Sequence, residues 1–300
     1  GARLVVLVGD ARQLPPTVLS DAARRRGFDR SLFERLEVAG HPRLMLRVQY
    51  RMHPAICHFP STHFYDGLLQ CAESVLEGAR RPPGSAGAAP GFLSVPARPG
   101  EPATLRLAPY VFFNVSGAAH AQESGSHSLH NSLEADFCVA LVRLLERVDA
   151  SWRRRASAGG DTASGLPGRV LLITPYAAQV RELSRRLRHS SAPPVEVCSV
   201  DSAQGREADV VIYSCVRANT RGGIGFVGDQ RRMNVALTRA RHALYLVGSE
   251  PALTASPDWG ALVRDARQRG CVRDVHKGIL QDEISLTQLI PACPPRSTPL

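Results

Sequence analysis

Seven short apolar runs are spread along this sequence, and their spacing constrains the fold more than any other feature. They lie at residues 4–8, 44–48, 110–115, 170–173, 195–200, 209–213 and 243–248. Runs of this length are typical of strands that are buried on both faces. Stretches with helical periodicity separate several of them. Strands that alternate with helices predict an α/β fold, with a mostly parallel sheet flanked by helices.

Two of the intervening stretches predict helices. In residues 133–148 the apolar side chains recur on one face, and Asn131 with Glu134 has the pattern of a capping box at its start. The second helix is expected from about residue 177 to residue 188, where apolar positions again recur at helical spacing.

The basic composition both suggests a partner and excludes a motif. The chain holds 37 Lys+Arg against 27 Asp+Glu, and Lys277 is its single lysine. The net charge of +10 favours an anionic partner. A glycine-rich phosphate loop needs a lysine, and the surroundings of Lys277 do not form one. No apolar run has the roughly 20 residues of a membrane span and no secretion signal is present, so no membrane contact and no secretion are expected.

Histidines and cysteines do not predict a metal site. His53, His58 and His63 recur every five residues, a step that turns each ring by about 140° on a helix, so the three cannot share a face. The seven cysteines lie far apart without a CxxC pair. They are interpreted as reduced thiols, not as a disulfide framework or a zinc site.

Four polar segments, each expected where a predicted strand ends, carry the residues suited to chemistry. They are residues 9–16, 49–54, 200–207 and 231–241. Ligands of open α/β sheets bind at the carboxyl ends of the strands. We therefore expect the four segments to gather at that edge of the sheet.

These segments, with one more, resemble the later motifs of superfamily 1 helicases of the up-frameshift and senataxin-like group. The similar stretches are, in order, GDARQLPP, VQYRMHP, ITPYAAQ, VDSAQGRE and RRMNVALTRAR. Connecting phrases such as SLFERL and FPSTHFYDGLL are similar too, and the resemblance runs from about Val5 to Cys271. It implies a RecA-like P-loop NTPase fold, ATP and Mg²⁺ as cofactors, and 5′ to 3′ movement on single-stranded RNA or DNA. It also implies residence in the nucleus or the cytoplasm, with the nucleus slightly favoured.

The resemblance assigns catalytic roles to three residues. Gln13 would sense the γ-phosphate and orient the attacking water, since an amide both donates and accepts hydrogen bonds. Arg51 and Arg239 match the two arginines that reach the triphosphate from the second domain. A guanidinium group fits the geometry of a phosphate, and such an arginine finger accelerates phosphoryl transfer by roughly a thousandfold or more.

Three further residues are implied to bind the nucleotide. Tyr50 matches the aromatic residue that stacks on adenine. The amide of Gly205 would lie near the phosphates, and the carboxylate of Glu207 would lie on the ribose or magnesium side. The magnesium ligands themselves are expected upstream of this chain, because Gly9-Asp10 is not the acidic strand end that holds the metal.

Contacts with nucleic acid are expected from Thr174, Pro175 and Tyr176, which lie between a predicted strand and a predicted helix, and from Ser199 and Ser202. Hydroxyl groups and backbone amides at such a turn can hold a phosphate, and such contacts read the backbone rather than the bases. For Tyr176 an alternative is that it only caps the turn.

Some charged residues have two interpretations. The arginine runs at residues 24–26 and 153–155 are either nucleic-acid patches or solvated faces. Arg241 is either a surface cation or part of the nucleotide site. Asp201 is either a ligand or a residue that shapes its own loop.

The missing phosphate loop and magnesium-binding motif predict the domain organisation. Residues 1–46 are interpreted as the end of the first RecA-like domain. Residues 47–270 form the second domain with loop insertions at about 78–109 and 150–168, and residues 271–300 form a partly disordered tail. The chain is therefore predicted to be the C-terminal portion of an active ATP-dependent helicase. The alternatives are a catalytically inactive pseudo-helicase that binds nucleic acid or a partner, and a free-standing arginine-rich RNA-binding module.

Overall fold

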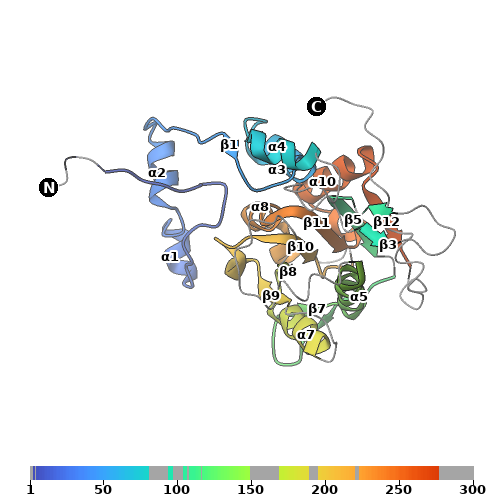
Figure 1. Cartoon of the computed structure of the whole chain (residues 1–300). Coiled ribbons are helices and arrows are strands. Elements are labelled where there is room, and N and C mark those ends of the chain that lie inside the picture. The colour runs from blue at the N-terminus through green and yellow to red at the C-terminus, as the bar shows by residue number, and fades with distance from the viewer. Residues whose placement is uncertain are drawn as a thin grey trace.

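A six-stranded sheet forms the centre of the molecule (Figure 1). This computed structural model describes residues 3, 5–80, 94–96, 104–106, 108–115, 117–148, 169–188, 195–219 and 223–276. The strands are ordered β12-β5-β11-β10-β8-β9, and every neighbouring pair is parallel. Their bounds are β5 Tyr110–Val115, β8 Val170–Thr174, β9 Glu196–Ser199, β10 Ala208–Ser214, β11 Ala240–Gly248 and β12 Val272–Val275. The predicted α/β fold is confirmed, and five of the seven apolar runs lie in this sheet.

Both faces of the sheet are buried, which explains why its strands appear in the sequence as continuous apolar runs. Along β5, Tyr110 and Phe112 contribute to one apolar layer. Val111 and Phe113 contribute to the other layer, as successive side chains of a strand must.

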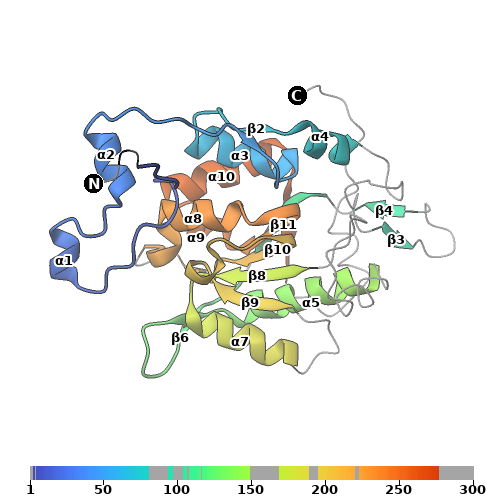
Figure 2. The same ribbon diagram turned by 60° about the vertical axis from the view of Figure 1, so that its left-hand side comes forward.

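Helices cover the two faces of the sheet (Figure 2). One face is covered by α5 (Ser132–Val148) and α7 (Ala177–Arg188), whose predicted bounds are confirmed. The other face is covered by α3 (Pro54–Phe64), α8 (Gln230–Leu237) and α10 (Pro257–Gln268). At the start of α5 the predicted cap is present, because the Asn131 side chain accepts a hydrogen bond from the Glu134 amide at 3.1 Å.

Short elements complete the described residues. They are α1 Asp21–Arg25, α2 Leu32–Val38, β1 Val48–Gln49, β2 Gln70–Cys71, α4 Glu73–Arg80, β3 Ser94–Pro96, β4 Thr104–Arg106, β6 Ala121–Gln122, β7 Leu129–His130, η1 Asp201–Ala203, η2 Gly225–Gly228 and α9 Glu250–Leu253. The predicted loop at residues 150–168 lies outside the described residues, as do residues 277–300. The expected tail from residue 271 is wrong at its start, because Val272–Val275 form β12 and pair with β5 in the sheet. None of the described helices has the length and apolar character that a membrane span requires.

Two predicted strands are wrong, and both belong to the N-terminal 48 residues. Val5, Val6 and Val8 are 68%, 73% and 87% exposed and lie in no strand, and of residues 44–48 only Val48 enters one, the two-residue β1. An apolar run becomes a buried strand only where another strand offers hydrogen bonds and a second layer offers burial. Within the described residues nothing offers these to residues 5–8.

The N-terminal residues 5–46 instead lie to one side of the sheet, with α1 and α2 apart from its strands (Figure 1), and side chains of α8 contact them at two positions. The Asn234 amide donates to the Arg12 carbonyl at 2.9 Å, and Arg231 pairs with Glu34 at 3.0 Å. Segments far apart in the sequence therefore meet along one helix.

Candidate nucleotide and nucleic-acid sites

The predicted site residues gather at two opposite edges of the sheet, not at one. Thr174 ends β8 and Ser199 ends β9, so both lie at the carboxyl edge. Glu207 directly precedes β10 and Arg239 directly precedes β11, which places both at the amino edge. The expectation of a single cluster at the carboxyl ends is wrong. The reason is geometric, because each connection between parallel strands must return from the carboxyl edge to the amino edge.

At the amino edge, Arg51 and Glu207 form an ion pair. The Arg51 Nε donates to Glu207 Oε2 at 2.6 Å, and Arg51 Nη1 donates to the Thr238 carbonyl at 3.0 Å. The hydrogen bond from Arg51 lowers the pKa of Glu207. Arg241 lies 3.9 Å from the other oxygen of Glu207, so it belongs to the edge of this cluster although its side chain is 48% exposed.

Arg239 is the buried member of the cluster, with 2% of its surface exposed. It donates to the Val235 carbonyl at 2.9 Å, to the Thr238 hydroxyl at 2.9 Å and to Gln13 Oε1 at 3.3 Å. Burial, with the nearby Arg51, lowers its pKa to about 10, so it stays protonated at neutral pH. Within the described residues no carboxylate forms an ion pair with Arg239, which leaves a buried cation suited to an anionic ligand.

Gln13 is held in place by a polar network. Its amide donates to Asp10 Oδ2 at 2.9 Å, and the Tyr65 hydroxyl donates to the same oxygen at 2.6 Å. Asn234 in turn donates to the Tyr65 hydroxyl at 2.8 Å. The network ties the segment around Gln13 to α8, so Gln13 and Arg239 face each other in a defined arrangement. Tyr65 was not singled out in the sequence, where its only signal is its place in FPSTHFYDGLL.

Tyr50 and Gly205 flank the cluster with open surfaces. The Tyr50 side chain is 72% exposed, next to Arg51. Gly205 has φ +78°, a left-handed conformation that favours glycine, and no atom lies within 4 Å of the place where a Cβ would be. The backbone there can be approached closely.

Gln49 shapes the loop that carries Arg51, a role that the sequence did not reveal. Its Oε1 accepts hydrogen bonds from the amides of Arg51 at 2.9 Å and Met52 at 2.7 Å. Its Nε2 donates to the Met52 carbonyl at 2.8 Å. One side chain thus fixes three polar groups of a turn, much as a capping residue does.

The described side chains of this cluster are poorly suited to bind a metal ion. Among the described residues, no group of three or more His, Cys, Asp or Glu side chains is placed to hold one. Glu207 is paired with Arg51 and lies close to Arg241, and two adjacent guanidinium groups disfavour a cation.

The carboxyl-edge residues differ in their access to solvent. Ser202 is exposed, and its hydroxyl lies 3.0 Å from that of Ser199. Thr174 is fully buried, with a hydroxyl that has no hydrogen-bond partner in the described part of the chain. Tyr176 is 5% exposed, and its hydroxyl lies 3.5 Å from the Ile224 carbonyl. In this conformation the ring of Tyr176 offers little surface for stacking on a base, and its hydroxyl contacts another loop, not the turn between β8 and α7. Pro175 is half-buried between the two.

An exposed aromatic residue outside the five helicase-like motifs lies at the same edge. Phe226 is 61% exposed and meets Tyr176 edge-on, with ring centroids 6.2 Å apart. The Arg232 guanidinium lies 5.5 Å from the Phe226 ring centre and pairs with Asp201 at 3.0 Å. Asp201 thus links its loop to α8, and its two interpretations, as a ligand or as a residue that shapes its own loop, stay open.

The sequence itself matches a known family. Residues 28–251 match a family profile described as an AAA domain. The chain belongs to this family. It is 37% identical over 279 residues to the regulator of nonsense transcripts 1 homolog of Arabidopsis thaliana. The aligned region covers 91% of this chain and 20% of that protein. It is 34% identical over 298 residues to helicase SEN1 of Saccharomyces cerevisiae, covering 97% of this chain and 12% of that protein.

These similarities confirm the resemblance to the up-frameshift and senataxin-like helicases and the RecA-like fold. The chain spans only 12% to 30% of the length of such relatives, the largest share being that of the probable helicase MAGATAMA 3 of Arabidopsis thaliana, at 34% identity. The domain bounds and the roles of individual residues stay predictions.

Proposed function

We propose that the chain supplies the second RecA-like half, with the end of the first, of an ATP-dependent helicase that moves 5′ to 3′ along single-stranded RNA or DNA. The observation that carries the proposal is the convergence of Gln13, Arg51, Glu207 and Arg239. These residues come from four separate segments, and Gln13 and Arg239, 226 positions apart, are in direct contact. The helicases among the relatives support it.

In this proposal the arginines act by charge and position. ATP, bound with magnesium, supplies the phosphoryl group that is transferred to water. Arg51 and Arg239 would neutralise the charge that spreads over the phosphate oxygens in the transition state, and Gln13 would orient the water. Gly205 would offer its amide, and Tyr50 would stack on the base. Magnesium ligands would come from outside these residues.

Arg51 could exchange its ion pair with Glu207 for a contact with the triphosphate. Its ion pair with Glu207 is part-exposed, and pairs of this kind contribute only about 1 kcal/mol or less. A triphosphate beside Arg239 could therefore draw Arg51 away from Glu207 at small cost. Glu207 would then be free to accept a hydrogen bond from the ribose.

Helix α8 would couple the two edges. It begins near Phe226 and Asp201 at the carboxyl edge, and Thr238 caps its end directly before Arg239 at the amino edge. Its eight residues span about 12 Å. A shift of Arg239 on nucleotide binding would thus move residues beside the strand-binding surface. Residence in the nucleus or the cytoplasm is part of the same proposal.

The experiment that tests the proposal measures ATP hydrolysis by the natural full-length protein, with and without a single-stranded oligonucleotide. Arg239→Ala is expected to lower the stimulated kcat by roughly a thousandfold, the usual effect of losing an arginine finger. Arg267→Ala is the matched control, since Arg267 pairs with Glu250 away from the cluster. Unchanged hydrolysis in Arg239→Ala would refute the arginine assignment. A wild-type protein that binds the strand without hydrolysing ATP would support the pseudo-helicase instead.

A further inference from the structure

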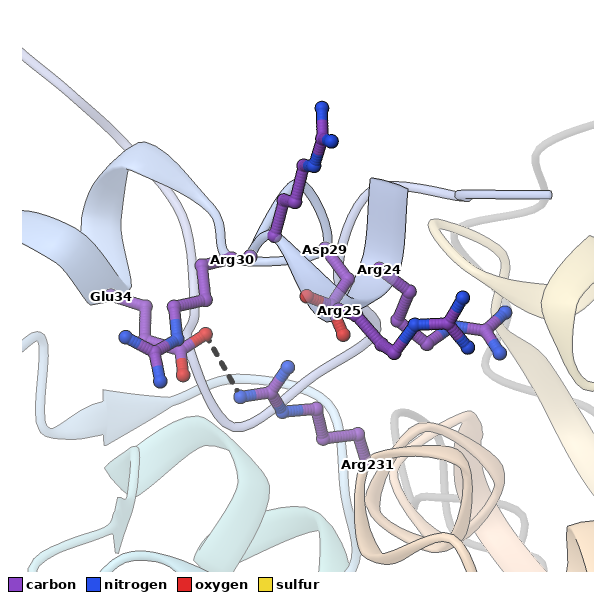
Figure 3. A pocket seen from close by; sticks show the side chains of 8 residues that line it. Arg24, Arg25, Asp29, Arg30, Glu34 and Arg231 are labelled. Carbon is purple, nitrogen blue, oxygen red and sulfur yellow. Dashed lines mark hydrogen bonds and ion pairs between the residues drawn. The ribbon is translucent and has the colours of Figure 1, made fainter. Parts of the chain in front are cut away.

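A basic pocket lies between the N-terminal residues and α8, outside both clusters described above (Figure 3). Its volume is about 520 Å³. Five arginines line it: Arg24, Arg25, Arg26, Arg30 and Arg231. We call this the arginine pocket. Figure 3 shows Arg231 extending from α8 toward Glu34 and Arg30, with Arg24 and Arg25 on the other side of Asp29.

The pocket carries an uncompensated positive charge. Its five arginines face two lining carboxylates, Asp29 and Glu34, and Asp21 beside the pocket compensates Arg24, which leaves a formal charge of +2, five minus three. Glu34 is occupied by Arg231 at 3.0 Å, and Arg24 pairs with Asp21 at 3.1 Å. Among the described residues no ion pair engages Arg25, Arg26 or Arg30. Like charges held together in a hollow raise the local potential and attract an anion.

The position of the pocket indicates which anion it takes. Arg231 and Arg232 are consecutive at the start of α8, so they lie on neighbouring faces of the same helical turn. Arg232 contacts Phe226 and Asp201, beside the serines expected to hold a strand. Arg231 precedes Arg232 by one residue, so the arginine pocket adjoins the first turn of α8, next to the contact of Arg232 with Phe226.

We propose that the arginine pocket binds phosphates of the single strand and extends the strand-binding surface of the carboxyl edge onto the N-terminal residues. The inference rests on the proposed function, because it requires a strand on that edge. Guanidinium groups match phosphate oxygens in pairs, and contacts of this kind fix position without reading sequence. In this proposal residues 24–26, interpreted above as a possible nucleic-acid patch, form one phosphate-binding site together with Arg231.

The test measures binding of a fluorescent single-stranded oligonucleotide to the full chain at several salt concentrations. The variant Arg25→Gln/Arg30→Gln removes two arginines that make no ion pair within the described residues, and it keeps the pair between Arg231 and Glu34. The control Arg185→Gln/Arg188→Gln removes the same charge from the exposed end of α7, on the far side of the sheet. Circular dichroism confirms that each variant is folded.

The pocket variant is expected to bind roughly tenfold more weakly at low salt. Its plot of log affinity against log salt should be less steep by about 1.4, or about 0.7 for each lost phosphate contact. The control variant should keep most of the affinity and most of the salt dependence of the wild type. Equal behaviour of the two variants would overturn the inference while leaving the proposed function in place. If the wild type does not bind the oligonucleotide, both the inference and the proposed function are wrong.

A second arm separates the strand from free nucleotide as the source of phosphate. Binding of a fluorescent ATP analogue is measured with the same variants. If the pocket variant loses the analogue but keeps the oligonucleotide, the pocket takes free nucleotide and the inference is wrong. If it loses only the oligonucleotide, the inference holds.

Discussion

Gln49 fixes the turn that presents Arg51, so its side chain is expected to matter for catalysis without touching ATP. Replacing Gln49 by Ala removes three hydrogen bonds to the backbone of Arg51 and Met52. Misplacement of a catalytic group by about 1 Å can lower a rate by roughly a hundredfold. We predict that Gln49→Ala lowers the stimulated kcat of the full-length protein by roughly ten- to a hundredfold, measured as ATP hydrolysis.

A positioning role predicts more than a loss of rate. Gln49→Glu keeps an acceptor for the two amides but loses the donor to the Met52 carbonyl, so it should fall between wild type and Gln49→Ala. Full activity in Gln49→Ala would show that the turn keeps its shape without this side chain. An equal loss of thermal stability in both variants would indicate a structural role only.

At the scale of residues, the charged members of the site could be identified from the sequence, whereas the burial of individual aromatic side chains could not. Arg51, Glu207 and Arg239 could be selected because each stands in a recognisable motif, and they do come together. Tyr176, which was predicted either to contact nucleic acid or to cap its turn, is buried, whereas Phe226 is exposed. Which of the two aromatic residues faces solvent depends on how the loop after β10 packs against Tyr176, and no local pattern carries that information.

At the scale of elements, the loop after β10 is held by a buried carboxylate on α5. Glu134 accepts hydrogen bonds from the Ser214 hydroxyl at 2.7 Å and from the Val216 amide at 2.8 Å. Val216 has φ +70°, which is rare for a β-branched residue. Glu134 therefore helps to maintain a strained turn directly beyond the sheet, on the carboxyl edge.

Burial raises the pKa of Glu134 to about 8, although the hydrogen bonds from Ser214 and Val216 oppose the shift. In the unfolded chain the pKa is near 4.5. Between these values the folded state binds more protons than the unfolded state. The contribution of Glu134 to stability is thus fully present below pH 4.5 and is lost as the pH rises through 8.

We therefore predict that Glu134→Gln alters the pH dependence of stability. Glutamine has no titration, so the free energy of unfolding of the wild type should fall relative to the variant as the pH rises from 5 to 8. The difference should change by at most about 1.4 kcal/mol per pH unit. Urea unfolding of both proteins at several pH values measures it. Parallel curves would contradict a raised pKa, and Asp136→Asn on the exposed side of α5 is the control.

Helices and strands could be predicted from the apolar pattern where the elements that pack against them lie in this chain. Five of the six strands of the sheet and the bounds of α7 could be predicted because each of these apolar runs packs between two helical layers. The edge strand β12, Val272–Val275, was missed because its sequence is short and half polar. Residues 5–8 have an equally apolar pattern, yet no described strand pairs with them. A run of valines and leucines specifies the tendency to form a strand, and only tertiary contacts decide whether one forms.

At the scale of the whole molecule, residues 5–46 and the sheet behave as parts of different stability. The segment is mostly exposed. It contacts α8 through the Arg12 carbonyl and Glu34, and it contacts Arg239 through Gln13. The central strands β10 and β11 are almost entirely buried. Few buried contacts mean low local stability, so backbone amides of the segment should exchange with solvent far faster than those of the sheet.

A nucleotide that joins Gln13 to Arg239 should reduce this difference, because it would bind the segment and the sheet body together. We predict that a slowly hydrolysed ATP analogue slows hydrogen exchange in residues 10–13 and 230–239, measured by mass spectrometry. Arg239→Ala should abolish the protection, whereas Arg267→Ala should keep it. Protection confined to the sheet body, with residues 10–13 unchanged, would mean that the nucleotide does not bridge the two parts. Because a ligand stabilises only the contacts it completes, this pattern tests the two-sided site independently of hydrolysis.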